Sequence, residues 1–205
     1  MVLGVLAVRA PADDFDFSGN FTYDNDVLQF NFTVGAPSSV TVFSSSWLQG
    51  DPPAGFDPML GIWDAAGNLI AFQDDGAVVG TTLSNGVPYS HGTWDSYYTV
   101  ALGAGDYIAT VTQFDNFNVG SLLSSGFVRD GVANRSFTSA LGYGGATQTY
   151  FNGVWDGLDP RTSAWEFHLL NVAGATVQPA VPEPSSAVAL ALGGLALLAL
   201  RRRRA

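Results

Sequence analysis

The sequence predicts an all-β domain, an antiparallel β-sandwich of jelly-roll type, followed by a single C-terminal transmembrane helix. Two observations predict the sandwich. Aromatic and β-branched residues alternate with polar ones, and 24 glycines separate the short apolar segments, which is typical of strands joined by tight turns. An unbroken apolar segment near the C-terminus predicts the helix. Residues 13–180 are long enough for one domain with its own core.

Alternation of apolar and polar residues locates the individual strands. Residues 15–21 and 28–34 alternate on either side of an Asp-Asn-Asp turn at 24–26 and predict a β-hairpin. Six further strands are expected at residues 40–43, 59–63, 69–73, 96–102, 107–114 and 165–172. This number of strands at this spacing is typical of a sandwich.

The N-terminal residues 1–12 contain a short apolar piece at 2–8, followed by Ala10-Pro11-Ala12, which fits an A-x-A cleavage site. No basic residue precedes the apolar piece. We interpret residues 1–12 as the remnant of a truncated signal peptide, so that the given start codon lies inside the true signal and the mature chain begins near Asp13. The alternative is an ordinary first strand.

The C-terminal residues 181–205 combine a Pro-Glu-Pro motif, an apolar segment and four arginines. A helix over 185–200 would be about 24 Å long, somewhat shorter than a hydrocarbon core of about 30 Å. The arginines would hold the C-terminus in the cytoplasm by the positive-inside rule, so that the domain lies on the other side of the membrane, outside the cytoplasm. A buried core helix is the alternative, but the segment has no polar face and ends in a charge cluster.

These features resemble the bacterial PEP-CTERM sorting signal, and the residues that carry the match are Pro182, Glu183, Pro184, Arg201, Arg202, Arg203 and Arg204. The resemblance implies recognition, and cleavage near Pro-Glu-Pro, by an exosortase, in bacteria with an outer membrane that make exopolysaccharide. The same kind of tail is also called an ice-binding protein C-terminal domain, a label that by itself says nothing about ice. The expected location is across the inner membrane, anchored transiently or permanently, and then at the cell surface or in the extracellular matrix.

Residues 15–127 carry a second resemblance. They contain, in order, a D-P-x-L strand at 57–60, a D-x-x-G turn at 64–67, a D-D-G loop at 74–76 and an L-x-x-G-x-Y strand at 102–107. This order is similar to a family of β-sandwich domains found with the same tail and, more distantly, to the bacterial pre-peptidase C-terminal domain. The segment 128–174 lies beyond the resemblance and is unassigned.

The charge of the domain excludes one class of partner. Residues 13–180 contain sixteen Asp and one Glu against three Arg, a net charge of −14, and the chain has no Lys. Such a surface repels nucleic acid. The preference for Asp over Glu points to turns and to Ca²⁺ ligation, because the short Asp side chain suits both. Without cysteine, neither disulfides nor thiolate metal sites stabilise the fold.

The adjacent carboxylates of Asp74 and Asp75 repel each other unless a cation or protons intervene, and with so few arginines Ca²⁺ is the preferred compensator. The spacing matches no EF-hand. Turn chemistry alone accounts for any single aspartate. The candidate Ca²⁺ ligands are Asp57, Asp74, Asp75, Asp95 and Asp115, with Asn116 as a neutral oxygen donor.

Catalytic residues are not expected, because the chain has two histidines, no cysteine and no G-x-S-x-G motif. Glu166 and His168 share one face of a strand, which we expect to be solvated. Trp155, flanked by Gly and Asp, is the candidate platform for a sugar ring, whereas Trp63 and Trp165 are expected in the core.

The sequence thus favours an exported, non-enzymatic protein of the cell surface or extracellular matrix that binds Ca²⁺ and exopolysaccharide. The alternative is a carbohydrate-active enzyme that uses a pair of carboxylates. Saturable glycan binding without release of sugar would favour the first hypothesis, and turnover abolished by one carboxylate substitution would favour the second.

Overall fold

The computed structural model describes residues 11–48, 55–141, 148–152 and 161–178. In these ranges the chain forms eleven strands and three short 3-10 helices, and all strand pairs are antiparallel. The predicted all-β antiparallel architecture is confirmed. The described part contains no helix long and apolar enough to cross a bilayer. The apolar segment 185–200 and residues 1–10 lie outside the described ranges, so the tail helix and the signal remnant stay predictions.

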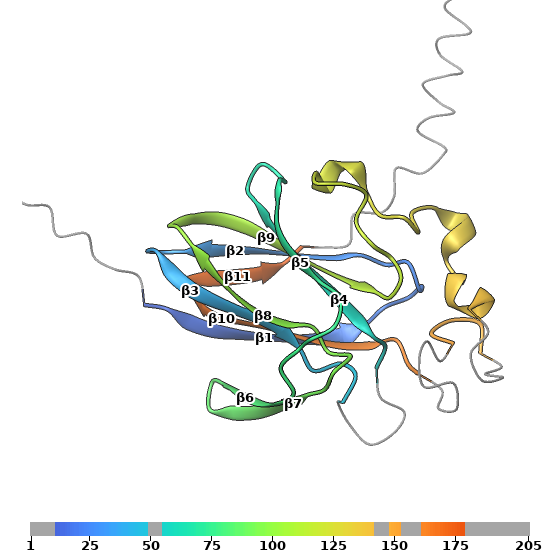
Figure 1. Ribbon diagram of the computed structural model, residues 1–205, viewed down its shortest axis with the longest axis horizontal. Helices are drawn as coiled ribbons and strands as arrows, with labels where there is room; N and C mark the ends of the chain where they lie inside the picture. The colour runs from blue at the N-terminus through green and yellow to red at the C-terminus, as the bar shows by residue number, and fades with distance from the viewer. Residues whose placement is uncertain (1–10, 49–54, 142–147, 153–160, 179–205) are drawn as a thin grey trace, which may run out of the picture.

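Two sheets form the layers of the sandwich (Figure 1). The first sheet has the strand order β1 (Asp13–Asn20), β10 (Ala164–Val172), β3 (Ser38–Ser44) and β8 (Tyr97–Leu102). The second has the order β11 (Gly174–Val177), β2 (Leu28–Val34), β9 (Gly105–Gln113), β4 (Pro58–Asp64) and β5 (Leu69–Gln73). A separate hairpin of β6 (Gly80–Ser84) and β7 (Val87–His91) packs outside the first sheet.

The core lies between the sheets and is rich in aromatic side chains. Phe30 of β2 is completely buried, and its ring centroid lies 4.6 Å from that of Phe167 and 5.9 Å from that of Trp165, both on β10 of the opposite sheet. Burying one such side chain contributes about 1.5–3 kcal/mol. Alternation along the strands therefore fixes which residues face inward, as the sequence predicted.

The predicted hairpin of residues 15–21 and 28–34 is wrong. The first of these strands, β1, pairs with β10, and the second, β2, pairs with β9 and β11 in the other sheet. Alternation specifies which face of a strand is buried but not which strand lies beside it. The turn at 24–26 therefore carries the chain from one layer to the other.

The unassigned segment 128–174 supplies a central strand. β10 lies between β1 and β3 and is paired with both. All six predicted single strands, β10 among them, occur within two residues of their expected bounds, whereas β6, β7 and β11 were not predicted. The C-terminal part of the domain is thus built into the sandwich and is not an appendage.

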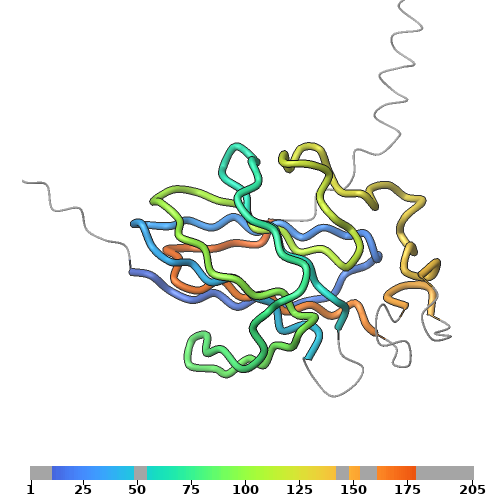
Figure 2. Tube along the Cα trace, in the orientation of Figure 1, coloured from blue at the N-terminus to red at the C-terminus, as the bar shows by residue number. Residues whose placement is uncertain are grey.

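Three 3-10 helices, η1 (Leu123–Ser125), η2 (Val132–Asn134) and η3 (Phe137–Ala140), belong to a segment that lies at one end of the sandwich (Figure 2). Asp24 holds this segment in place. Its Oδ2 accepts a hydrogen bond from the Thr138 N–H at 2.9 Å, and its Oδ1 accepts one from the Phe151 N–H at 2.7 Å.

Candidate cation site

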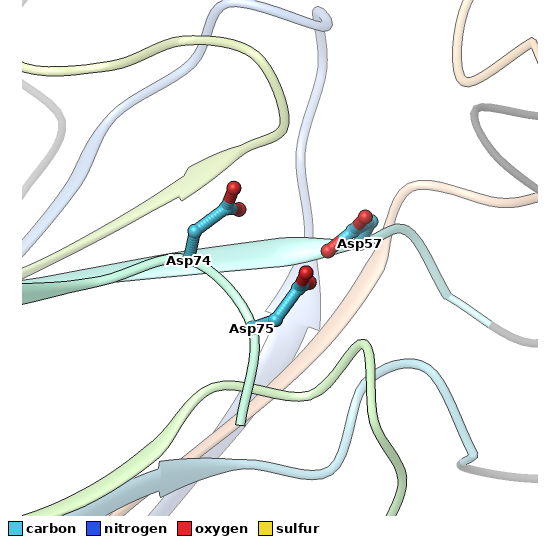
Figure 3. A group of neighbouring side chains, drawn as sticks. All are labelled: Asp57, Asp74 and Asp75. Atoms are coloured by element: carbon cyan, nitrogen blue, oxygen red, sulfur yellow. The ribbon is translucent and has the colours of Figure 1, made fainter. Parts of the chain in front are cut away.

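Three aspartates converge where two neighbouring strands of the second sheet meet at one edge. Asp57 precedes β4, and Asp74 and Asp75 follow β5. Because β4 and β5 are antiparallel, the start of one lies beside the end of the other. One carboxylate oxygen from each residue lies within 4.8 Å of the other two, and Figure 3 shows the side chains turned toward one another.

The carboxylate of Asp57 is completely buried, and neither of its oxygens has a hydrogen-bond partner among the residues that the structure describes. Burial raises the pKa of Asp57 to about 9, and the neighbouring charges of Asp74 and Asp75 add to this increase. Burial likewise raises the pKa of Asp74 to about 6, and the Oδ1 atom of Asp74 is also buried without a partner. An ionised carboxylate in such a place is stable only beside a positive charge.

The arrangement suits a hard cation of the size of Ca²⁺. Ca²⁺ binds six to eight oxygens at about 2.3–2.6 Å, so ligand atoms of one ion lie up to about 5 Å apart. Neutral oxygens lie nearby. Gln113 pairs in register with Pro58, and both polar atoms of its buried side chain are unpartnered in the described ranges. The Gln73 side chain donates to the Asp75 carbonyl at 2.8 Å, and its own Oε1 is buried without a partner there.

Asp95, the fourth predicted ligand, is also completely buried but has hydrogen-bond donors of its own. Its Oδ1 accepts from the Trp47 N–H at 2.9 Å and from the Ser44 hydroxyl at 3.1 Å. Its Oδ2 accepts from the Gly92 N–H at 3.0 Å. Asp95 therefore closes a turn and joins it to the end of β3.

The last two predicted ligands, Asp115 and Asn116, both accept hydrogen bonds from Arg129. The guanidinium donates from Nε and from Nη2 to the two oxygens of Asp115, each at 2.9 Å. The Oδ1 atom of Asn116 accepts from the Arg129 N–H at 2.8 Å. The structure thus brings together three of the six predicted ligands and gives the other three different partners.

Sequence reasoning missed a second buried polar group, which lies under the β6–β7 hairpin. The expectation that Glu166 and His168 lie on a solvated face is wrong for His168, which is completely buried. The ring of Tyr89 covers it at a centroid distance of 4.1 Å, and Phe43 stacks on it at 4.3 Å. No pattern in the sequence shows that this hairpin folds over the outer face of the first sheet.

This second group has the atom connectivity of a hydrolase triad. His168 Nδ1 lies 2.7 Å from Asp16 Oδ1, and His168 Nε2 lies 2.9 Å from Ser45 Oγ. The hydroxyl proton of Ser45 is shared, however, because Glu166 Oε2 also lies 2.9 Å from Oγ.

Two further observations describe the surroundings of Ser45. Ser45 is completely buried, so an acyl substrate does not reach its hydroxyl in this structure. The N–H of Ser45 donates to the Glu166 carbonyl, and the N–H of Trp47 donates to Asp95. Neither group is therefore available to stabilise an oxyanion. The network ties β1, β3 and β10 together.

The tryptophan expectations divide between described and undescribed residues. Trp63 and Trp165 are buried, as predicted, and Trp63 Nε1 donates to the Thr110 hydroxyl at 3.1 Å. Trp155 lies outside the described residues, so its role as a sugar platform stays a prediction.

Comparison with known protein families identifies a motif at the C-terminal end of the chain. The family model of the PEP-CTERM protein-sorting motif matches residues 180–204, which include the Pro-Glu-Pro motif and the four arginines. A search of curated proteins gives no match. The C-terminal segment is therefore a PEP-CTERM sorting motif, which marks the chain for export, for membrane-associated sorting and for recognition by an exosortase.

Proposed function

We propose that this protein is a non-enzymatic component of the cell surface or extracellular matrix whose β-sandwich binds Ca²⁺ through Asp57, Asp74 and Asp75. The sorting motif delivers the domain to the outside. The observation that carries the Ca²⁺ site is the carboxylate of Asp57, which is buried without a donor among the described residues and lies beside two further carboxylates. Exopolysaccharide is the proposed partner in the matrix, in line with the resemblance of the tail.

The compensating charge has to come largely from solution, because the arginines of the domain are engaged elsewhere. Arg129 pairs with Asp115, and Arg135 lies over the ring of Tyr23 at 4.2 Å. Arg161 packs on Trp47 at 3.2 Å. Arg161 does lower the pKa of Asp57, but burial and the neighbouring carboxylates outweigh this effect. A bound divalent cation neutralises the carboxylates where these arginines do not.

The location of the protein suits such a site. Extracellular Ca²⁺ modules bind with Kd values of about 10⁻⁴–10⁻³ M, which is sufficient where the ion is abundant. A site formed by three carboxylates on two loops has the ligand chemistry for this range. The ion would join the start of β4 to the end of β5 and so stabilise the edge of the second sheet.

The enzyme alternative, a glycosidase with a carboxylate pair, has less support. Glycoside hydrolysis needs both carboxyl groups in contact with the sugar. Asp57 is completely buried, so a sugar does not reach the residue whose pKa would suit a general acid. The same burial that weakens the enzyme hypothesis strengthens the cation hypothesis.

Thermal unfolding of the full chain with and without Ca²⁺ tests the proposal. At a Ca²⁺ concentration about 100 times Kd, binding stabilises the native state by about 2.7 kcal/mol, which raises Tm by about 5–10 °C for a domain of this size. Asp57→Asn should abolish this increase. Asp13→Asn removes the same charge from an exposed position on β1 and should leave it intact. A wild-type Tm that is the same in chelator and in 10 mM Ca²⁺ would contradict the proposal.

A further inference from the structure

The cation site lies at the end of the second sheet from which the chain leaves for the sorting motif. Strand register shows this across four neighbouring strands, β5, β4, β9 and β2. Gln73 at the end of β5 pairs with Leu60 of β4, Leu60 pairs with Val111 of β9, and Val111 pairs with Leu28 at the start of β2. The end of β5, the start of β4, the end of β9 and the start of β2 therefore share one edge.

The last described residue lies at the same edge. β11 runs antiparallel to β2, with Val177 opposite Phe30. The N–H of Gln178 donates to the carbonyl of Gln29 at 2.7 Å and so continues the ladder past the end of β11. The chain thus departs toward the Pro-Glu-Pro motif from the edge that carries Asp57.

The width of the second sheet and the length of the linker show how close this edge can come to the membrane. Neighbouring strands are about 4.8 Å apart, so the five strands from β11 to β5 span about 19 Å. The seven residues from Gln178 to Ser185, where the apolar segment begins, reach at most about 24 Å. A tail held in the bilayer therefore allows the cation site to reach the membrane surface.

One side of the site is exposed to solvent. Asp57 is completely buried, Asp74 is partly buried and Asp75 is exposed, so the cluster is closed on one side and open on the other. Three carboxylates do not supply all of the six to eight oxygens of Ca²⁺ unless each binds through both atoms. An external anionic oxygen can complete the shell on the side of Asp75.

The net charge of the domain indicates which kind of partner binds only with the help of a cation. The domain carries a net charge of −14 and is repelled by an anionic membrane surface. Lipid phosphate groups are negative, carry hard oxygens and lie within reach of this edge. A divalent cation that binds oxygens of both the domain and the lipid offsets this repulsion, because both then belong to one coordination shell.

We propose that Ca²⁺ held by Asp57, Asp74 and Asp75 also binds phosphate oxygens of lipid head groups, which docks this edge of the sandwich on the membrane while the tail is anchored. This inference rests on the Ca²⁺ site proposed above. It adds a partner to the site: the anionic surface of the membrane that holds the sorting motif.

Fluorescence energy transfer to labelled lipids tests the docking. The chain has no cysteine, so a single label can be introduced at either end of the sandwich. Ala77→Cys is exposed two residues beyond Asp75, and Ala104→Cys is exposed in the β8–β9 turn at the opposite edge. The full chain is reconstituted in vesicles of phosphatidylglycerol and phosphatidylcholine, and transfer is measured with chelator and with Ca²⁺.

The proposal expects Ca²⁺ to increase transfer from position 77 more than from position 104. It also expects the Kd for Ca²⁺ to be about tenfold lower in these vesicles than in detergent micelles without phosphate. Asp57→Asn should remove both effects, and Asp13→Asn should remove neither. The paired variants also correct for Ca²⁺ that binds to the lipid directly.

Other outcomes separate the two proposals. Ca²⁺ binding of equal affinity in vesicles and micelles, with no change in transfer, would overturn the docking and leave the Ca²⁺ site standing. The same result together with tighter Ca²⁺ binding in the presence of alginate, a carboxylated polysaccharide, would replace the lipid by a glycan. Absence of Ca²⁺ binding under all conditions would overturn both proposals.

Discussion

Asp57 and Asp95 are both completely buried and close enough for the charge of Asp95 to raise the pKa of Asp57, yet their surroundings differ in kind. Asp95 accepts hydrogen bonds from Ser44, Trp47 and Gly92, whereas Asp57 accepts none from the described residues. Burial raises both pKa values, that of Asp95 to about 6 and that of Asp57 to about 9, because only Asp95 has donors that offset the desolvation.

The difference shows how to tell a structural carboxylate from a cation ligand. Asp24 follows the pattern of Asp95, since it too is completely buried and accepts backbone hydrogen bonds from Thr138 and Phe151. A buried carboxylate surrounded by donors stabilises the loops that supply them. A buried carboxylate surrounded by other carboxylates is left without compensation until a proton or a cation binds.

The largest expected effect is the pH dependence of the free energy of unfolding that Asp57 causes. Without Ca²⁺, the pKa of Asp57 is about 9 in the folded state and 3.8 in the unfolded chain, so its contribution to stability is complete below about pH 4 and is lost as the pH rises to 9. Asp57→Asn lacks this loss. Its free energy of unfolding in chelator should exceed that of wild type by an amount that grows by about 4 kcal/mol between pH 5 and pH 8.

Urea unfolding of the full chain at several pH values in chelator measures this difference. Saturating Ca²⁺ should remove the wild-type loss, because the ion takes the place of the proton. A difference between the two proteins that stays constant with pH would show that Asp57 is ionised in the folded state without a cation, and that the comparison with Asp95 is wrong.

The second prediction concerns Asp95→Asn. An amide retains one acceptor but places an NH₂ group against N–H donors, and hydrogen bonds to a charged group contribute about 1.5–3 kcal/mol each. We expect a loss of about 3 kcal/mol, equal in chelator and in Ca²⁺, measured by the same urea unfolding. The Ca²⁺-induced increase in Tm should persist in this variant. A variant that folds normally but no longer responds to Ca²⁺ would assign Asp95 to the cation shell.

The cation cluster could be predicted from the sequence in part, because its members adjoin two recognisable strands. The D-P-x-L and D-D-G motifs place Asp57 and Asp74 at strand ends, and those two strands are neighbours in the sheet. The roles of Asp95 and Asp115 could not be predicted, because their partners Trp47 and Arg129 are brought to them only by the tertiary fold. The sequence shows which carboxylates are present but not which hydrogen-bond donors surround each one in the fold.

The same limit applies to the fold. Short apolar or alternating segments located β3, β4, β5 and β8 closely, since their buried residues leave a pattern in the chain. They did not identify partners, which is why β1 and β2 were wrongly joined in a hairpin. β11 has only four residues and carries no alternation long enough to detect.

The smallest expected effect concerns the buried network around His168, whose pH dependence has the opposite sign. Burial lowers the pKa of His168, although the hydrogen bond and charge of Asp16 raise it, so the neutral ring is favoured in the folded state. Its contribution to stability is present above the unfolded pKa of about 6.5 and is lost as the pH falls below that value. The groups that face the ring are Asp16, Ser45, Phe43, Tyr89 and His91, the last of which disfavours the charged ring.

His168→Gln should therefore lower stability at pH 7, where it loses the contact with Asp16, but flatten the decline of the wild type between pH 6.5 and pH 5. Urea unfolding over this range measures both effects, and Ca²⁺ should alter neither. Wild-type stability that rises on acidification through this range would indicate a charged ring between Asp16 and Glu166. The network would then resemble the proposed Asp57 site, a set of carboxylates compensated by a cation, with His168 in the place of the metal.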